Sequence, residues 1–357
     1  KVLISTANRV HEMHHLDGLG LSAQVNIDTS KVMQHVQQLR DRFTRATLKD
    51  VDTWKAEHKI SGRAEFLNAN TIQVNEKQYQ AKHFILAVGS TPTIDEKMKA
   101  ELGTRLITSD QIFELEQLPQ ALAVIGSGVI AIELAQAMHR LGVKTDIFAR
   151  SRKVGTLVSA NMQKLAQDEL SKELNLHFET LPTEYKKMLN GVELKYQEND
   201  QQHLLNVDYV LLATGRKSLL NTLKLENIDA QYQDLKNLPV DPTTKQLSNH
   251  SIYIVGDAHT NAPIQHEATH EGRIVVQSCL EHKKPKNVKI LTPLGIIFSS
   301  PEMASVGKNV KQLLDKKIEF VTGFVDYSKQ GRAIVNAKSQ GAVEVYIDKT
   351  SRNILGA

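Results

Sequence analysis

The stretch Gly126-Ser127-Gly128-Val129-Ile130-Ala131 has the residue types and spacing of a turn that binds the pyrophosphate of a dinucleotide. A first glycine permits a tight turn, a second lets the backbone approach the phosphates, and a small third residue allows a strand and a helix to pack closely. The phosphates then meet free N–H groups at the positive end of the helix dipole. A plain tight turn is the alternative interpretation.

The segments on both sides of this stretch fit such a site. The apolar run at 122–125 predicts a buried parallel strand, and residues 129–141 predict a helix that ends at Gly142. Residues 144–149 predict a second strand. Because the stretch lies within one strand–helix–strand unit, the sequence predicts dinucleotide binding rather than an isolated turn.

The residues after the second strand bear on the choice of nucleotide. A carboxylate there would accept hydrogen bonds from the ribose of NAD, but the position holds Ala149. Asp146 is nearer the middle of the strand and is expected to be structural. Arg150 and Arg152 are able to bind a 2′-phosphate through charge-assisted hydrogen bonds, which favours NADP. NAD beside a solvated basic loop remains open.

Composition excludes other classes of protein. The 357 residues, 41% of them hydrophobic, are enough for two or three domains, and no apolar run reaches the length of a membrane-spanning helix. The net charge of +4 is small and dispersed, and the basic run at 283–286 is expected to be a surface loop. Neither nucleic-acid nor membrane binding is therefore expected, and no residues form a recognisable metal site.

The chain has one cysteine, Cys279, in the apolar run 274–280. It is predicted to be a buried, inert thiol. A disulfide within the chain is impossible, which fits a reducing cytoplasm.

The remaining pattern predicts an α/β fold. Helices are expected at 30–58, 160–180 and 266–282, and strands within 59–88 and at 207–213 and 251–255. From about residue 290 the alternation favours a mostly antiparallel module. Gly256 and Asp257 follow a predicted strand, where an aspartate is able to bind the hydroxyls of a sugar-alcohol chain and a glycine lets a ligand lie against the backbone.

With these motifs in order, the chain resembles the pyridine nucleotide–disulfide oxidoreductases, and within them the lipoamide dehydrogenases most closely. The resemblance rests on the segments 86–92, 126–133, 213–216, 256–257, 266–273, 293–298 and 301–302. It implies two Rossmann-like domains, for FAD and NAD(P), and an α+β interface domain. The implied boundaries are 1–105 and 229–288 for the FAD domain, 106–228 for the NAD(P) domain and 289–357 for the interface domain.

The resemblance also implies roles for individual residues. Lys1 matches the lysine that closes the family's cysteine motif, and Glu133 matches the glutamate paired with it beside the flavin N5. A fixed cation there favours a reduced, anionic flavin, and the carboxylate holds the cation in place. Further cofactor contacts are implied for Ala64, Gly89, Gly256, Asp257 and Gln265 on the flavin side and for Gly215 on the nicotinamide side.

Three parts of the family pattern are absent from these residues: the first FAD-binding turn, the redox-active cysteine pair and the C-terminal histidine–glutamate base. We therefore expect a chain that is truncated at both ends, inactive alone, and poor in FAD binding and dimerisation. His266 and His270 are expected to be helix residues of the FAD domain.

The expected full-length enzyme is a homodimer that moves electrons between NAD(P)H, FAD and a small dithiol or disulfide, or a lipoyl domain. A sibling resembling glutathione reductase, mercuric reductase or the soluble transhydrogenase is one alternative. A non-catalytic nucleotide-binding fragment is another.

Overall fold

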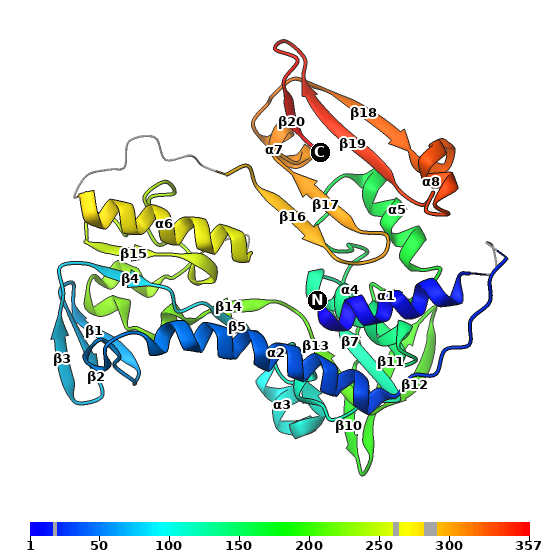
Figure 1. The fold of residues 1–357 in the computed structure, drawn as a ribbon, viewed down its shortest axis with the longest axis horizontal. Helices are drawn as coiled ribbons and strands as arrows, with labels where there is room; N and C mark the ends of the chain where they lie inside the picture. Colours follow the sequence, from blue (N-terminus) through cyan, green and yellow to red (C-terminus); the bar gives the residue numbers. More distant parts are fainter. Residues whose placement is uncertain (17–19, 260–263, 282–290) are drawn as a thin grey trace. The chain divides into compact units, whose positions relative to one another are not determined.

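A computed structural model describes residues 1–16, 20–259, 264–281 and 291–357 (Figure 1). These residues group into two units of dense internal contact: 1–45, 92–215 and 292–357 form the first, and 46–91 and 216–291 the second. The basic run at 283–286 and the expected boundary after 288 lie outside the described residues. The other expected domain boundaries stay predictions, because contact density does not identify what each unit binds.

A five-stranded parallel sheet forms the centre of the first unit. The strand order is β6-β13-β7-β8-β9, with every neighbouring pair parallel. The strands are β6 (Leu106–Ile107), β7 (Ala121–Ile125), β8 (Lys144–Ala149), β9 (Asn175–Phe178) and β13 (Tyr209–Leu212). The predicted strands at 122–125 and 144–149 are confirmed. The strand predicted over 207–213 begins at Tyr209, because Val207 ends a preceding antiparallel strand.

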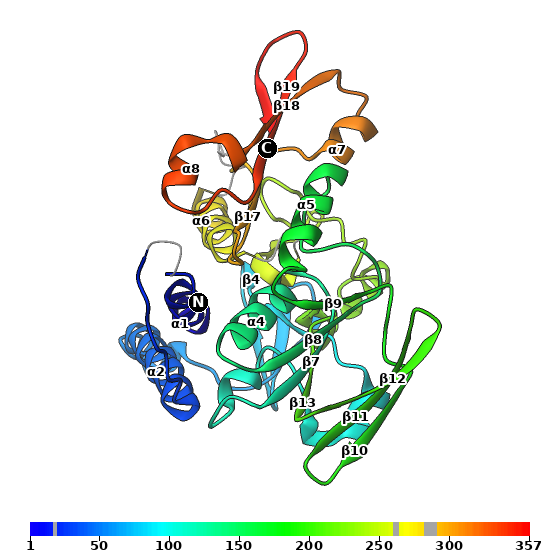
Figure 2. The ribbon, with the colours of Figure 1, turned by 90° about the vertical axis from the view of Figure 1, so that its right-hand side faces the viewer.

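Helices α1 (Val2–His14) and α4 (Val129–Arg140) share one apolar core in this unit. Figure 2 shows α4 beside β7 and β8, and the helix predicted over 129–141 is confirmed. The helix predicted over 160–180 is wrong in its second half. Helix α5 (Ala160–Leu170) ends at Leu170, and residues 175–178 form a strand that pairs with β8. That long-range pairing overrides the local periodicity.

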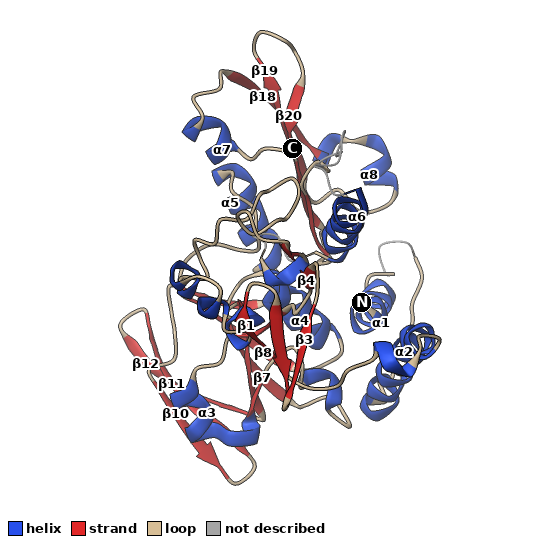
Figure 3. Cartoon of the chain, turned by 90° about the vertical axis from the view of Figure 1, so that its left-hand side faces the viewer, coloured by secondary structure: helices blue, strands red, loops and turns tan. Residues whose placement is uncertain are grey.

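A small antiparallel sheet was not expected from the sequence. It consists of β10 (Glu184–Met188), β11 (Gly191–Glu198) and β12 (Gln201–Val207), drawn in red in Figure 3. Val192, Leu194 and Tyr196 alternate inward and join a core with Phe148 of β8. The same unit contains α3 (Glu96–Leu102), whose N-cap Asp95 accepts a hydrogen bond of 2.9 Å from the backbone N–H of Met98.

The C-terminal strands are antiparallel, as predicted from the alternation after residue 290. They are β16 (Leu294–Ile297), β17 (Met303–Val306), β18 (Phe320–Asp326), β19 (Ala342–Asp348) and β20 (Ile354–Gly356), accompanied by α7 (Val310–Asp315) and α8 (Gly331–Val335).

The second unit is built on short sheets. They are β1 (Ala64–Asn68), β2 (Thr71–Val74) and β3 (Lys77–Gln80), which are antiparallel; β4 (Phe84–Leu86) parallel to β15 (Ile252–Ile254); and β5 (Ser90–Pro92) beside β14 (Arg216–Ser218). Helix α6 (Gln265–Glu281) confirms the helix predicted from residue 266, and His266 and His270 lie on it.

Helix α2 (Thr29–Asp52) contains the boundary between the two units. The helix predicted over 30–58 continues too far, because the chain leaves the α-helix after Asp52 and forms only a 3₁₀ turn at Ala56–His58. Met33 and Val36 are buried, whereas Phe43 is 64% exposed and Leu48 52% exposed. Across the described residues, no helix has the length and apolar character needed to cross a bilayer.

Candidate functional site

The turn between β7 and α4 requires glycine at position 126. Gly126 has φ of +124°, and a Cβ there would lie 2.5 Å from the carbonyl oxygen of Ala213. Its N–H donates a hydrogen bond of 2.9 Å to the carbonyl of Phe148 on β8. The turn is therefore held tightly against two neighbouring strands, in the conformation that the sequence motif predicted.

Gly128, the N-cap of α4, leaves space for a ligand. No side chain caps the helix there, and a Cβ would meet no described atom within 4 Å. The first N–H groups of the helix are thus available to an anion. Ala131 is completely buried, with Val129 and Ile130 packed partly against the same core. The cradle fits a pyrophosphate.

Ser127 ties this turn to the loop that follows β8. Its hydroxyl donates a hydrogen bond of 2.6 Å to the carbonyl of Lys153, and its own carbonyl accepts one of 2.8 Å from the N–H of Gly155. The basic loop is therefore anchored beside the phosphate cradle.

The two arginines of that loop differ in their surroundings. Arg152 forms an ion pair of 3.7 Å with Glu179 and lies 5.3 Å from the ring centroid of Phe178. Arg150 is exposed and has no ionic or hydrogen-bond partner among the residues described. Ala149, at the end of β8, is fully buried. Arg150 is therefore the freer cation for a ligand phosphate.

Gly215 also has a conformation that favours glycine. Its φ is +130°, a Cβ would meet no described atom within 4 Å, and its carbonyl accepts a hydrogen bond of 2.9 Å from the N–H of Thr93. This is an open position at the C-terminal side of the sheet, as expected for a contact with a nucleotide.

Lys1 and Glu133 lie in one neighbourhood, but they are not directly paired. Glu133 accepts a hydrogen bond of 2.9 Å from the backbone N–H of Phe298, and the Lys1 ammonium lies 4.6 Å from the centroid of the Phe298 ring. Within the described residues, no ion pair joins the two side chains.

Sequence reasoning missed the neighbour of Glu133 on the same face of α4. The buried Gln136 side chain donates a hydrogen bond of 2.8 Å to the carbonyl of Ser300 and accepts one of 2.7 Å from its N–H. The same amide donates a bond of 2.8 Å to Glu173. In the sequence, the one indication of this contact is a glutamine among the apolar residues of the predicted helix.

In the second unit, Gly256 and Asp257 form the first turn after β15. Gly256 has φ of +64°, and its N–H donates a hydrogen bond of 2.7 Å to the buried Glu271. Lys245 forms an ion pair of 2.7 Å with the other oxygen of Glu271. The half-buried Asp257 accepts a bond of 3.1 Å from the hydroxyl of Ser90. The aspartate is therefore oriented by its neighbours at a strand end, as predicted.

The other predicted flavin-side residues are separate positions of the same unit. Gly89 has φ of +69°, with its carbonyl accepting a hydrogen bond of 3.1 Å from Leu219. Ala64 is half-buried at the start of β1, and Gln265 is exposed at the start of α6. No side-chain contact in the described structure joins Ala64 or Gln265 to Asp257.

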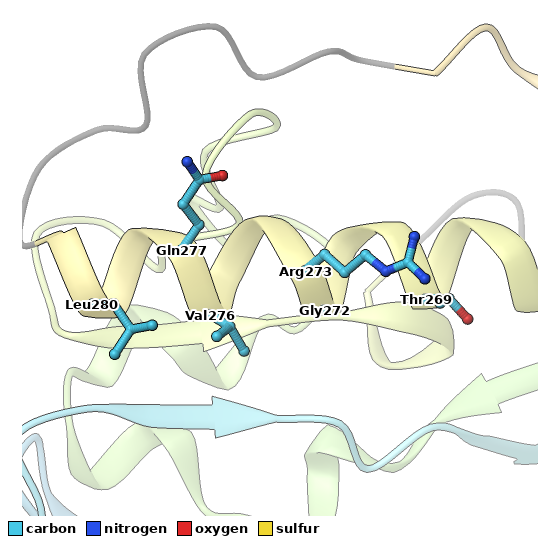
Figure 4. Close-up of a pocket in the computed structure, with 6 residues that line it drawn as sticks. All are labelled: Thr269, Gly272, Arg273, Val276, Gln277 and Leu280. Carbon is cyan, nitrogen blue, oxygen red and sulfur yellow. The ribbon is translucent and has the colours of Figure 1, made fainter.

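Cys279 is half-buried on α6 rather than fully buried as predicted. Burial raises the pKa of its thiol, while a hydrogen bond with Tyr253 opposes the rise. Its helix also lines a shallow groove, in which Val276 and Leu280 extend from the same side (Figure 4). The groove contains none of the predicted site residues.

A buried histidine lies behind the basic loop. The two ring nitrogens of His177 on β9 each lie 2.9 Å from a carboxylate oxygen, one of Asp146 and the other of Glu198. Its ring stacks on Phe148 at 4.6 Å. The expected structural role of Asp146 is consistent with this contact. Burial alone would lower the pKa of His177, but the two carboxylates outweigh it and raise the pKa above its usual value.

This arrangement predicts a stability contribution that is lost in alkali. Because the pKa of His177 is raised in the folded state, its protonation stabilises the protein fully below the unfolded-state pKa of about 6.5. This stabilisation is lost as the pH rises through the folded-state pKa. We expect the difference in unfolding free energy between the natural protein and His177→Asn to shrink from about pH 6 to about pH 9. Urea titrations across that range measure it. In a Glu198→Gln background the pH-dependent part should be smaller, and an unchanged or growing difference would contradict the assignment.

Comparisons with known proteins agree with this geometry. The model of the pyridine nucleotide-disulphide oxidoreductase family matches residues 2–272, and that of the family's dimerisation domain matches residues 294–357. The chain therefore belongs to the pyridine nucleotide-disulphide oxidoreductase family, whose members bind FAD and NAD(P).

Among relatives, a mercuric reductase from Staphylococcus aureus is 32% identical over 300 residues, which cover 84% of this chain and 54% of the relative. A dihydrolipoyl dehydrogenase from Geobacillus stearothermophilus is 27% identical over 363 residues, covering 100% of this chain and 76% of the relative. The chain thus spans about half the length of the first and three quarters of the second.

The fold is shared with solved structures. A crystal structure of LpdA from Mycobacterium tuberculosis matches with a TM-score of 0.80 at 19% identity, covering 100% of this chain and 78% of that one. The flavoprotein disulfide reductase RclA from Escherichia coli, as a Cu(II) complex, matches with a TM-score of 0.76 at 17% identity, covering 100% and 77%. The predicted α/β fold with Rossmann-type domains and a dimerisation domain is confirmed.

Proposed function

We propose that this chain is the nucleotide-binding body of a disulfide oxidoreductase that resembles dihydrolipoamide dehydrogenase. In the full-length enzyme, electrons would pass between NAD(P)H, FAD and a dithiol or disulfide. The uncapped N-terminus of α4 at Gly128 carries this proposal, because it combines free N–H groups, open space and a turn that only glycine accommodates.

The residues of the chain would bind and orient the cofactors. Gly126 to Ala131 would hold the pyrophosphate of the nicotinamide nucleotide, Gly215 would lie along it, and Asp257 would hold the flavin side chain. When bound, the nicotinamide supplies a hydride that the flavin accepts. Glu133, fixed by the N–H of Phe298, would set the charge next to Lys1. Ala64, Gly89, Gly256 and Gln265 would supply the remaining flavin contacts.

The disulfide step needs residues that are not among the 357. Thiol–disulfide exchange requires a thiolate nucleophile and a second thiol, and the sequence contains a single cysteine. The proposed substrate is a small dithiol or a lipoyl domain, and the proposed assembly is a cytoplasmic homodimer joined through the C-terminal strands. A mercuric reductase-like acceptor is the second candidate, favoured by the relative at 32% identity.

The nicotinamide preference is proposed to be NADP, with Arg150 as the phosphate ligand. Arg150→Ala is expected to weaken NADPH binding by about tenfold or more, since a hydrogen bond to a charged group contributes roughly 1.5–3 kcal/mol. NADH binding should hardly change. Arg152→Ala is the matched control, because Arg152 is already engaged by Glu179. Equal losses for both nucleotides in fluorescence titrations would show that Arg150 does not bind the 2′-phosphate and would contradict the proposal.

The visible absorbance spectrum of the full-length protein, titrated anaerobically with NADPH and NADH, tests the function. A flavin spectrum that is bleached by one nucleotide and recovers with a lipoyl disulfide is expected. Recovery with mercuric ion and no recovery with the disulfide would favour the second candidate. A folded, colourless protein that takes up no FAD would overturn the proposal.

A further inference from the structure

Imidazole side chains gather at the C-terminal end of α1, away from the nucleotide site. His11, His14 and His15 lie in or just after its last turn. His11 lies in the last turn of the helix, and His15 is its C-cap. Their ring centroids are 4.1 Å apart, with the ring planes tilted by 41°. The His11 side chain is 28% exposed and His15 is exposed, so solutes reach both.

Each ring has its Nδ1 atom next to an oxygen, through a hydrogen bond in His15 and a longer ionic contact in His11. The Nδ1 of His15 lies 2.8 Å from the carbonyl oxygen of His11. A carbonyl only accepts, so His15 donates from Nδ1 and keeps an unprotonated Nε2. The Nδ1 of His11 faces the Glu173 carboxylate at 3.7 Å, which favours the same tautomer. Histidines that bind metals use this pattern, with the other ring nitrogen held by a carbonyl or carboxylate.

The ring spacing suits chelation by both Nε2 atoms. A metal bound at about 2.0–2.1 Å from an imidazole nitrogen lies roughly 3 Å from the ring centre. If the two nitrogen–metal bonds meet at about 90°, the ring centres lie roughly 4–5 Å apart. This range includes the 4.1 Å found here.

We propose that His11 and His15 form a surface site for a divalent transition-metal ion, with Cu(II) bound more tightly than Ni(II) or Zn(II). The preference follows the general order of affinity for nitrogen ligands. Water would complete the coordination, because the described residues contain no cluster of three or more ligating side chains. The negative end of the helix dipole favours a cation at this position.

Charged groups of both signs lie around the rings. The guanidinium of Arg140 is the nearest positive group, and Glu173 neutralises it through two hydrogen bonds of 2.5 and 2.8 Å. Glu12, on the same turn, forms an ion pair of 3.4 Å with Lys338. The two nearby carboxylates, Glu12 and Glu173, therefore offset part of the positive charge around the rings.

Cu(II) titration followed by electron paramagnetic resonance tests the site, with Cys279→Ser as the common background to remove the thiol. The starting protein should bind one equivalent of Cu(II) with a signal from two nitrogen ligands. His15→Ala should weaken this binding by at least about tenfold, since loss of an outer-shell partner alone costs about 10–100-fold. His14→Ala, which removes a neighbouring exposed imidazole, is the matched control and should retain the signal.

Two results would overturn the proposal: retention of the two-nitrogen signal in His15→Ala, or equal loss in His14→Ala and His15→Ala. Circular dichroism of each variant distinguishes loss of the site from loss of the helix. His11→Gln provides a second variant, which should abolish the two-nitrogen signal while its helical content is retained. These readouts do not depend on the proposed enzymatic function.

Discussion

Gly126→Ala is expected to abolish nicotinamide nucleotide binding and to destabilise the first unit. The new Cβ would lie 2.5 Å from the carbonyl oxygen of Ala213, and the residue would have to adopt φ of +124°. Such a backbone alone costs about 1–3 kcal/mol, and relieving the overlap adds to this. Urea unfolding and nucleotide titration measure the two effects.

Gly128→Ala is the matched control because its backbone is ordinary. Its φ is −76°, and no described atom lies within 4 Å of the new Cβ. We expect a loss of stability of no more than about 1 kcal/mol, the usual effect of a poor N-cap. Nucleotide binding should nevertheless weaken, because the methyl group enters the phosphate cradle. If Gly128→Ala binds nucleotide normally, the cradle is not where the pyrophosphate lies.

Arg140→Met is expected to destabilise the protein by about 3–5 kcal/mol, the usual cost of removing one partner of a buried ion pair. The Arg140 side chain is 3% exposed and binds both oxygens of Glu173. It also donates a hydrogen bond of 2.7 Å to Asn8 of α1. The substitution leaves the carboxylate without its cation. Chemical denaturation measures the loss.

Two comparisons sharpen this prediction. Arg140→Met combined with Glu173→Gln should recover part of the stability, because the unpaired charge is gone. Asp168→Asn breaks the exposed pair with Lys164, with side chains 78% and 56% exposed, and should cost no more than about 0.5 kcal/mol. A loss in Arg140→Met as small as in Asp168→Asn would show that the buried network adds little.

The geometry of the turn before α4 could be predicted from the sequence because its determinants are local. A single steric or hydrogen-bonding reason explains the small residue at each of Gly126, Gly128 and Ala131. All three positions lie within one strand–helix–strand unit. The parallel strands were equally visible as short apolar runs. The antiparallel sheet β10–β12 was not predicted, although Val192, Leu194 and Tyr196 alternate with polar residues.

The contacts of Glu133 could not be predicted from local pattern. Its partner Phe298 is 165 residues away, and Ser300 is 164 residues from Gln136. The end of α5 was missed for a similar reason, because residues 175–178 become a strand only by pairing with β8. Local propensity has no access to such partners.

Helix α4 has a consequence for exchanging parts between related proteins. Its first turn forms the phosphate cradle, while Glu133 and Gln136 bind the backbone of Phe298 and Ser300. A nicotinamide-binding segment transplanted from a relative would carry the cradle but leave these backbone partners behind. A functional chimera must therefore keep the backbone of residues 298–300 in place against α4, although more than a hundred residues separate them in the sequence.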